Sequence, residues 1–301
     1  IADEGGVSLT YQRADESFAS PLRTSAFDVH VAFSLETMEA ERDSQSWSAQ
    51  FIGAGYVHDH AFARVKAQSM ALRQRLAAQG AEFIICFFDE NSCDDPRVGP
   101  SHAFRAENYR VLLERVLADP TLGIVFKPKK PRTLRHRLGP DVTRLLDEVV
   151  ATGRCVVFEE GAVSTPVLPC EASQAADVTI GLLYGATAAL EAALAGSPTL
   201  LIDREGLPYH PLNRLGIGRV VFRDWASLWS ALSAYRCDPT SCRGFGDWSS
   251  ILPSIDPFRD GRAAERLGTY IVWLAHALGE GRSREDALEA CRRRYASQWG
   301  E

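Results

Sequence analysis

The sequence predicts an α/β protein built on a doubly wound parallel sheet. From Glu82 onward, short apolar runs alternate with amphipathic stretches along the chain. Short apolar runs suit strands that are buried on both faces, and amphipathic stretches suit the helices that cover those faces. Hydrophobic residues make up 46% of the 301 residues and charged residues 24%, which are ordinary values for a globular protein.

Six apolar runs are the candidate strands, and four amphipathic stretches between them are the candidate helices. The expected strands cover residues 82–88, 122–128, 154–160, 177–183, 197–203 and 218–224. The expected helices cover residues 105–119, 142–153, 186–196 and 224–235. Residues 129–138, KKPRTLRHRL, are basic and contain proline, so we expect a loop at the carboxyl end of the second strand. Open parallel sheets bind their ligands at that edge.

The two ends of the chain depart from this pattern. We expect two strands around a charged turn at 27–34 and 50–60, one amphipathic helix at 61–80 that ends at Gly80, and two more helices after Pro257. We therefore divide the chain into three parts. These are the end of another domain with its linker (1–60), a central α/β domain (61–257) and C-terminal helices that pack on the sheet or at a domain junction (258–301).

Charge and cysteine usage exclude several classes of protein. The net charge of -6 argues against broad binding to nucleic acid or anionic lipid, and no apolar run approaches the ~18 residues of a membrane span. The seven cysteines are an odd number and several lie in apolar runs, so we expect reduced thiols in a cytoplasmic protein.

The segment 176–203, ADVTIGLLYGATAALEAALAGSPTLLID, predicts a strand that turns sharply into a helix at Gly185, Ala186 and Thr187. Small residues let the backbone approach a ligand, and the free N–H groups and dipole of a helix N-terminus favour an anion. Glu191, one turn into this helix, is then expected near a ribose hydroxyl. The alternative is that Gly185 only permits the turn and Thr187 caps the helix. The segment is not G-x-G-x-x-G and lacks the lysine of a P-loop.

Polar residues follow the first two candidate strands at the same edge. Asn91 and Ser92 can donate hydrogen bonds to phosphate or sugar, and the preceding Asp89 and Glu90 can orient hydroxyl groups. Lys127 and Lys129, with Lys130, place positive charge where it can neutralise a diphosphate. A solvated run of surface charge is the alternative for the lysines.

Two later loops add candidates. Glu159 and Glu160 can accept hydrogen bonds from ribose or base, unless they are ordinary strand-end acids. His210 is a candidate for a contact with the leaving phosphate or for proton transfer, and the alternative is a structural loop histidine. We interpret Asp94 and Asp95 as loop acids rather than metal ligands, and we expect neither a metal nor a cofactor.

Six segments together resemble a known family over residues 26–235. They are DVHVAFS, FIGAGYVHD, FIICFFDENS, GIVFKPKKP, the segment 176–203 and HPLNRLGIGRVVF. They resemble the C-terminal, donor-binding half of GT-B-type glycosyltransferases of bacterial surface polysaccharide biosynthesis, including relatives that transfer glycerophosphate. The resemblance implies two facing Rossmann-like domains, with a nucleotide-activated sugar held by the C-terminal one. It implies that Lys127 and Lys129 face the donor phosphates, that residues 185–187 form the phosphate turn and that Glu191 lies near ribose.

The chain departs from the family at its front, where only about sixty residues precede the helix at 61. We therefore expect a fragment of a longer enzyme, with a partner domain or chain supplying the acceptor site, and we leave the catalytic base unassigned. The leading hypothesis is metal-independent transfer of a sugar to a capsule, lipopolysaccharide or other lipid-linked acceptor, in the cytoplasm or at the inner face of the membrane. A glycerophosphotransferase of the same fold, a noncatalytic nucleotide-binding module, and a nucleotide-sugar epimerase that uses Glu90, Glu160 and His210 stay open.

Overall fold

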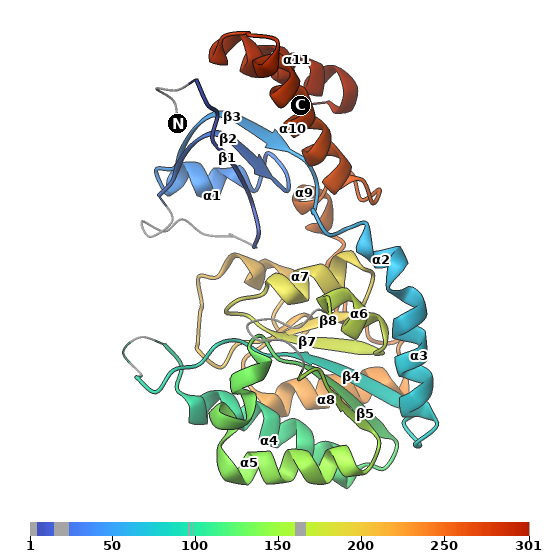
Figure 1. The fold of residues 1–301 in the computed structure, drawn as a ribbon. Helices are drawn as coiled ribbons and strands as arrows, with labels where there is room; N and C mark the ends of the chain where they lie inside the picture. The colour runs from blue at the N-terminus through green and yellow to red at the C-terminus, as the bar shows by residue number, and fades with distance from the viewer. Residues whose placement is uncertain (1–4, 15–23, 96, 98, 160–166, 301) are drawn as a thin grey trace. The chain divides into compact units, whose positions relative to one another are not determined.

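The computed structural model describes residues 5–14, 24–95, 97, 99–159 and 167–300. The chain forms two compact units, one of residues 1–62 with 249–301 and one of residues 63–248 (Figure 1). Among the described residues, no helix is both long enough and apolar enough to cross a membrane.

The second unit contains a six-stranded sheet that is parallel throughout, as the sequence predicts. Its strands stand in the order β6-β5-β4-β7-β8-β9, and every one lies inside a predicted run. With β4 as the first strand, this order is the 3-2-1-4-5-6 arrangement of doubly wound Rossmann-like sheets. The strands are β4 (Phe83–Phe88), β5 (Leu122–Lys127), β6 (Cys155–Val157), β7 (Val178–Leu182), β8 (Thr199–Ile202) and β9 (Val221–Phe222).

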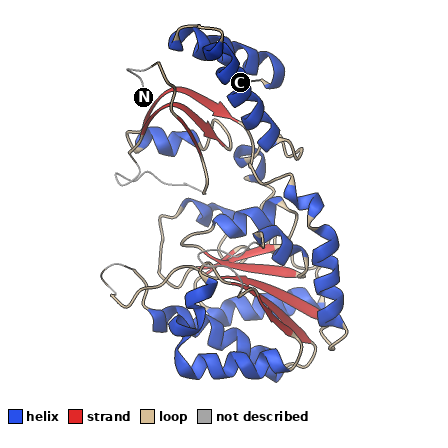
Figure 2. Cartoon of the chain, in the orientation of Figure 1, coloured by secondary structure: helices blue, strands red, loops and turns tan. Residues whose placement is uncertain are grey.

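Helices cover both faces of this sheet, because its central strands are apolar on both sides (Figure 2). Ile85 of β4 joins a core with α4 and α5, whereas Ile84 points to the opposite core, with α3, α6 and α7. Period-two alternation in a strand produces this division. The helices of the unit are α2 (Ala61–Arg64, which begins in the first unit), α3 (Lys66–Ala77), α4 (His102–Ala118), α5 (Leu134–Ala151), α6 (Pro169–Gln174), α7 (Thr187–Leu194) and α8 (Trp225–Cys237), with 3-10 turns at Pro131–Thr133 and Pro211–Leu215.

The predicted loop at 129–138 is wrong in its second half, since α5 already begins at Leu134. Leu134 and Leu138 are four residues apart and both buried, so they anchor an apolar helix face that the basic composition conceals. Gly139, with φ of 72°, and Pro140 then kink the helix before it continues. The sequence-based expectation placed the helix start after this kink.

The predicted helix at 61–80 is two helices, α2 and α3, separated at Val65. Gly80 follows the end of α3 with φ of +96°, which agrees with its predicted role in ending the helix. The short helix α6 has no counterpart among the predicted elements, because its six residues, PCEASQ, are too few to show a helical period.

The first unit has a parallel three-stranded sheet in the order β1-β2-β3. The predicted charged turn at 35–49 is wrong, because parallel neighbours need a crossover and α1 supplies it between β2 and β3. Val29 and Ile52 of the sheet share a core with Tyr270 of α10 and Leu288 of α11. The elements are β1 (Leu9–Tyr11), β2 (Ala26–Ala32), α1 (Met38–Asp43), β3 (Trp47–Gly53), α9 (Leu252–Ile255), α10 (Ala263–Gly279) and α11 (Arg284–Trp299).

All seven cysteines lie within the described residues and are free thiols, in agreement with the expectation of reduced cysteines. Cys86, Cys155, Cys170 and Cys291 are buried, and Cys237 is exposed.

Candidate functional site

The candidate site lies where the order of the six-stranded sheet reverses. β4 and β7 are neighbours, yet the chain leaves β4 toward β5 on one side and leaves β7 toward β8 on the other. The connections after these two strands therefore diverge, and open α/β sheets bind ligands in the crevice beyond their carboxyl ends. The loop after β4 begins at Asp89, and the turn after β7 contains Gly185.

A buried ion pair fixes the loops after β4 and β5. The Asp89 carboxylate accepts a hydrogen bond from Arg137 Nη2 of α5 at 3.0 Å, and the side chains are only 2% and 5% exposed. The same carboxylate accepts a hydrogen bond from the backbone N–H of Lys129. Arg137 also donates to the backbone oxygens of Glu90 and Lys130, each at 3.3 Å. Because these buried groups bond to one another across the two loops, they hold the loops in one arrangement.

Glu90 joins the loop after β4 to the turn after β7. Its carboxylate accepts a hydrogen bond from the Lys129 ammonium. Burial raises the pKa of the Glu90 carboxyl, and the charge and hydrogen bond of Lys129 oppose that increase. A Cβ placed on Gly185 would lie 2.5 Å from Glu90 Cδ, so the two residues are in direct contact. Gly185 also has φ of +83°, a backbone conformation that favours glycine.

Lys127 is the second cation of the site, at the carboxyl end of β5. It is half-buried, and burial lowers the pKa of its ammonium, with the nearby Glu191 carboxylate as the strongest opposing charge. In the described part of the chain, no group accepts a hydrogen bond from this ammonium. A partly desolvated cation that lacks hydrogen bonds has unused capacity for an anionic ligand.

Glu191 lies deeper than the sequence-based expectation of a ribose contact requires. It is 2% exposed, and its Oε1 accepts a hydrogen bond from the backbone N–H of Cys170 at 2.8 Å. Cys170 is in the first turn of α6, so the carboxylate satisfies one of the free N–H groups of that helix. A contact with ribose requires the Glu191 carboxylate to come to the surface.

The turn at 185–187 forms at the predicted place. α7 begins at Thr187, and its N-cap residue is Ala186, which has no side chain that can cap the helix. The alternative in which the Thr187 side chain acts as the N-cap therefore does not hold. The contact of the turn at 185–187 with a phosphate stays a prediction.

The remaining predicted residues have varied surroundings. Asn91 Oδ1 is buried without a hydrogen-bond partner in the described part of the structure, and Ser92 Oγ lies 2.8 Å from His102 Nδ1.

Glu159 forms an exposed ion pair with Arg135 at 3.0 Å, whereas Glu160 lies outside the described residues. His210 Nδ1 accepts a hydrogen bond from Leu212 N at 3.2 Å and so caps the 3-10 turn that follows β8.

Sequence reasoning missed Arg137, which was counted in the basic loop. The sequence pattern that could have revealed it is its position three residues after Leu134 and one before Leu138. Both leucines are buried residues of the same helix. An arginine on an apolar face requires a buried partner, and Asp89 is that partner.

No protein-family model and no curated protein matches the sequence. Among solved structures, the wall teichoic acid polymerase TagF is similar. Its H548A variant is 11% identical, with 81% of this chain and 57% of that chain covered at a TM-score of 0.53. Its H444N variant after a 15 minute soak with CDPG is 10% identical, with coverages of 81% and 55% and a TM-score of 0.51. Anabaena Alr3699/HepE in complex with UDP and glucose is 10% identical, with coverages of 88% and 71% and a TM-score of 0.49.

These identities are too low to indicate more than a shared fold. The chain also spans little more than half the length of the TagF structures that it matches. The strand order 3-2-1-4-5-6 and the likeness to TagF together show that this chain has a GT-B-type fold, in which residues 63–248 form a Rossmann-like unit.

Proposed function

We propose that residues 63–248 bind the diphosphate of a nucleotide-activated sugar, and that the protein transfers the sugar to an acceptor of bacterial surface polysaccharide biosynthesis. The observation that supports this most is the Lys127 ammonium, which is partly desolvated and has no hydrogen-bond acceptor in the described structure. It belongs to the strand next to β4, beside the point where the sheet order reverses.

The chemistry of glycosyl transfer fits this arrangement. As the bond between the sugar and the diphosphate breaks, negative charge grows on the leaving phosphate. A positioned cation stabilises this charge more strongly in the transition state than in the ground state, which is the condition for catalysis. In this proposal Lys127 contacts the phosphates directly, and the N-terminal end of α7 adds its dipole. Lys129 contributes its half-exposed ammonium and is held by Glu90.

Asp89 and Arg137 position this cation site and are too deeply buried to contact the donor. They hold the backbone of Lys129 and Lys130, so they determine where the loop after β5 presents its lysines. We assign no catalytic base. In this proposal a further domain or chain supplies the acceptor site.

Calorimetric titration of the purified chain with UDP, GDP, CDP, CMP and TDP tests the binding step. We expect one diphosphate to bind at micromolar concentration and Lys127→Met to weaken it at least tenfold. Lys66→Met is the matched control, because Lys66 is exposed on α3 and is the one lysine outside the segment 127–130. Equal affinity in the two variants would contradict the proposed site.

Product analysis with the full-length protein tests the reaction. Transfer yields a glycosylated acceptor and free nucleotide, whereas an epimerase yields an isomeric nucleotide sugar without any acceptor. A nucleotide-binding module binds without turnover. Because one TagF structure was soaked with CDPG, CDPG belongs among the donors tested, and its consumption would favour the glycerophosphotransferase alternative.

A further inference from the structure

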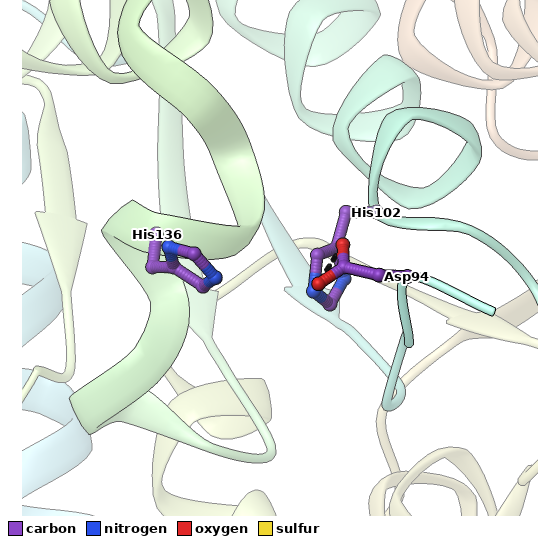
Figure 3. Close-up of side chains that lie close together, drawn as sticks. All are labelled: Asp94, His102 and His136. Carbon is purple, nitrogen blue, oxygen red and sulfur yellow. Dashed lines mark ion pairs between the residues drawn. The ribbon is translucent and has the colours of Figure 1, made fainter.

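Three residues with metal-binding side chains meet beside the loop after β4. Asp94 belongs to that loop, His102 is the first residue of α4 and His136 lies in the first turn of α5. One ligand atom from each residue lies within 4.8 Å of the other two. Figure 3 shows Asp94 against His102, with His136 across from them on its helix. The residues are 8 and 34 positions apart in sequence, so no local motif groups them.

The polar contacts of His102 suit a metal ligand. Its Nδ1 lies 2.8 Å from Ser92 Oγ, and its Nε2 lies 3.2 Å from Asp94 Oδ1. The Ser92 hydroxyl can accept a hydrogen bond from Nδ1–H, and in that tautomer Nε2 carries the lone pair that a metal ion needs. A metal ion between Nε2 and Asp94 Oδ1 would be bound by both atoms. An outer hydrogen bond on the second ring nitrogen also orients most histidine ligands.

The distances agree with a small tetrahedral ion. Bonds of about 2.0 to 2.2 Å to zinc, at tetrahedral angles, place neighbouring nitrogen and oxygen ligands roughly 3.3 Å apart. The Asp94 and His102 atoms already stand at 3.2 Å. The ring of His136 lies 5.7 Å from that of His102, and because His136 is exposed, its side chain can rotate toward the ion. Two imidazoles and one carboxylate also form a donor set that suits zinc better than calcium or magnesium.

The charges around the cluster leave its carboxylate available. Within the described chain, Arg97 pairs with Asp95 rather than Asp94, and Arg135 pairs with Asp147 and Glu159. The N-terminal ends of α4 and α5 disfavour a cation. Their dipoles at an exposed position are a small effect beside the binding free energy of a zinc site.

We propose that Asp94, His102 and His136 bind one Zn²⁺ ion, with a fourth position open to water. The ion ties the loop after β4 to the first turns of α4 and α5. This proposal does not depend on nucleotide binding, and it revises the interpretation of Asp94 as a simple loop acid.

The test uses the untagged full chain, stripped with a chelator and dialysed against Zn²⁺. We expect one zinc per chain, a higher melting temperature with zinc, and at least a tenfold loss of affinity in Asp94→Asn and in His136→Ala. Both positions are exposed, so these variants should fold, which circular dichroism checks. The matched controls are His276→Ala on α10 and Cys237→Ser, which removes the exposed thiol.

Cobalt gives a second readout of the ligands. We expect Co²⁺ to produce the visible bands of a four-coordinate site without a thiolate charge-transfer band, and His136→Ala to abolish those bands. The proposal is overturned if the chain binds no zinc, if Asp94→Asn and His136→Ala bind it as tightly as the wild type, or if Cys237→Ser removes the binding.

Discussion

The side chain of Glu90 lies directly against Gly185, so that a Cβ on Gly185 would stand 2.5 Å from Glu90 Cδ and 2.6 Å from Oε1. This contact joins the two loops that diverge at the reversal of the sheet. The turn after β7 therefore requires glycine at position 185 for two reasons. The φ of +83° favours glycine, and Glu90 occupies the space that a Cβ would need.

We expect Gly185→Ala to destabilise the protein more than Gly196→Ala. Gly196 also has a positive φ, of +89°, but nothing lies within 4 Å of its missing Cβ. Gly196→Ala should therefore cost only the backbone strain of about 1 to 2 kcal/mol, whereas Gly185→Ala adds the clash with Glu90. Urea unfolding of both variants measures the difference.

The combination of Gly185→Ala with Glu90→Ala separates the two effects. Removing the Glu90 side chain should relieve the clash and leave the backbone strain, so Gly185→Ala should cost about as much in the Glu90→Ala background as Gly196→Ala costs in the wild type. Equal losses for the two single glycine variants would show that Glu90 moves aside freely.

Arg137→Met should reduce the free energy of unfolding by about 3 to 5 kcal/mol, because it leaves the buried Asp89 carboxylate without its ion-pair partner. Arg144→Met breaks an ion pair with Asp141 whose side chains are 70% and 72% exposed. That control should cost less than about 1 kcal/mol. The double variant Asp89→Asn, Arg137→Met should recover part of the loss, and chemical unfolding of the four proteins checks the series. Similar losses for Arg137→Met and Arg144→Met would contradict the structural role of the buried pair.

The sequence predicted more of the fold than of the side-chain network. Runs such as FIICFF are apolar on both faces, and that local property was enough to identify the strands of the second unit. The link between Asp89 and Arg137 joins residues 48 positions apart, and it forms only because β4 and β5 are neighbours. The burial of Glu191 likewise depends on where α6 packs, and α6 is too short to leave a helical pattern. The position of Lys127 at the end of β5 could be predicted, because a strand end is a local feature of the sequence.

Glu191→Ala should destabilise the protein by about 1 to 3 kcal/mol, since it leaves the Cys170 N–H without its carboxylate partner. Glu191→Gln should cost less, because its amide oxygen can still accept that hydrogen bond. Urea unfolding and nucleotide titration of both variants distinguish two roles for the residue. If Glu191 contacts ribose, Glu191→Gln should weaken nucleotide binding far more than it weakens folding. Parallel losses would assign it a structural role.

Lys127 should take up protons when a nucleotide diphosphate binds at alkaline pH. In the free protein, burial lowers the pKa of its ammonium, so deprotonation begins below the ordinary value of 10.5. Between this lowered pKa and 10.5 the unfolded chain binds more protons than the folded chain. The stability of the folded state therefore decreases as pH falls from 10.5 to the lowered pKa, and it is recovered as pH rises again to 10.5. Bound phosphate reverses the shift, because a neighbouring anion favours the charged ammonium.

Titrations above pH 8 isolate the proton uptake of the lysine, because a terminal phosphate with a pKa of about 6 is already ionised there. Calorimetry in buffers of different ionisation enthalpy should show proton uptake in the wild type and in Lys66→Met, and none in Lys127→Met. Uptake that persists in Lys127→Met would assign the proton to another group and remove Lys127 from contact with the phosphates.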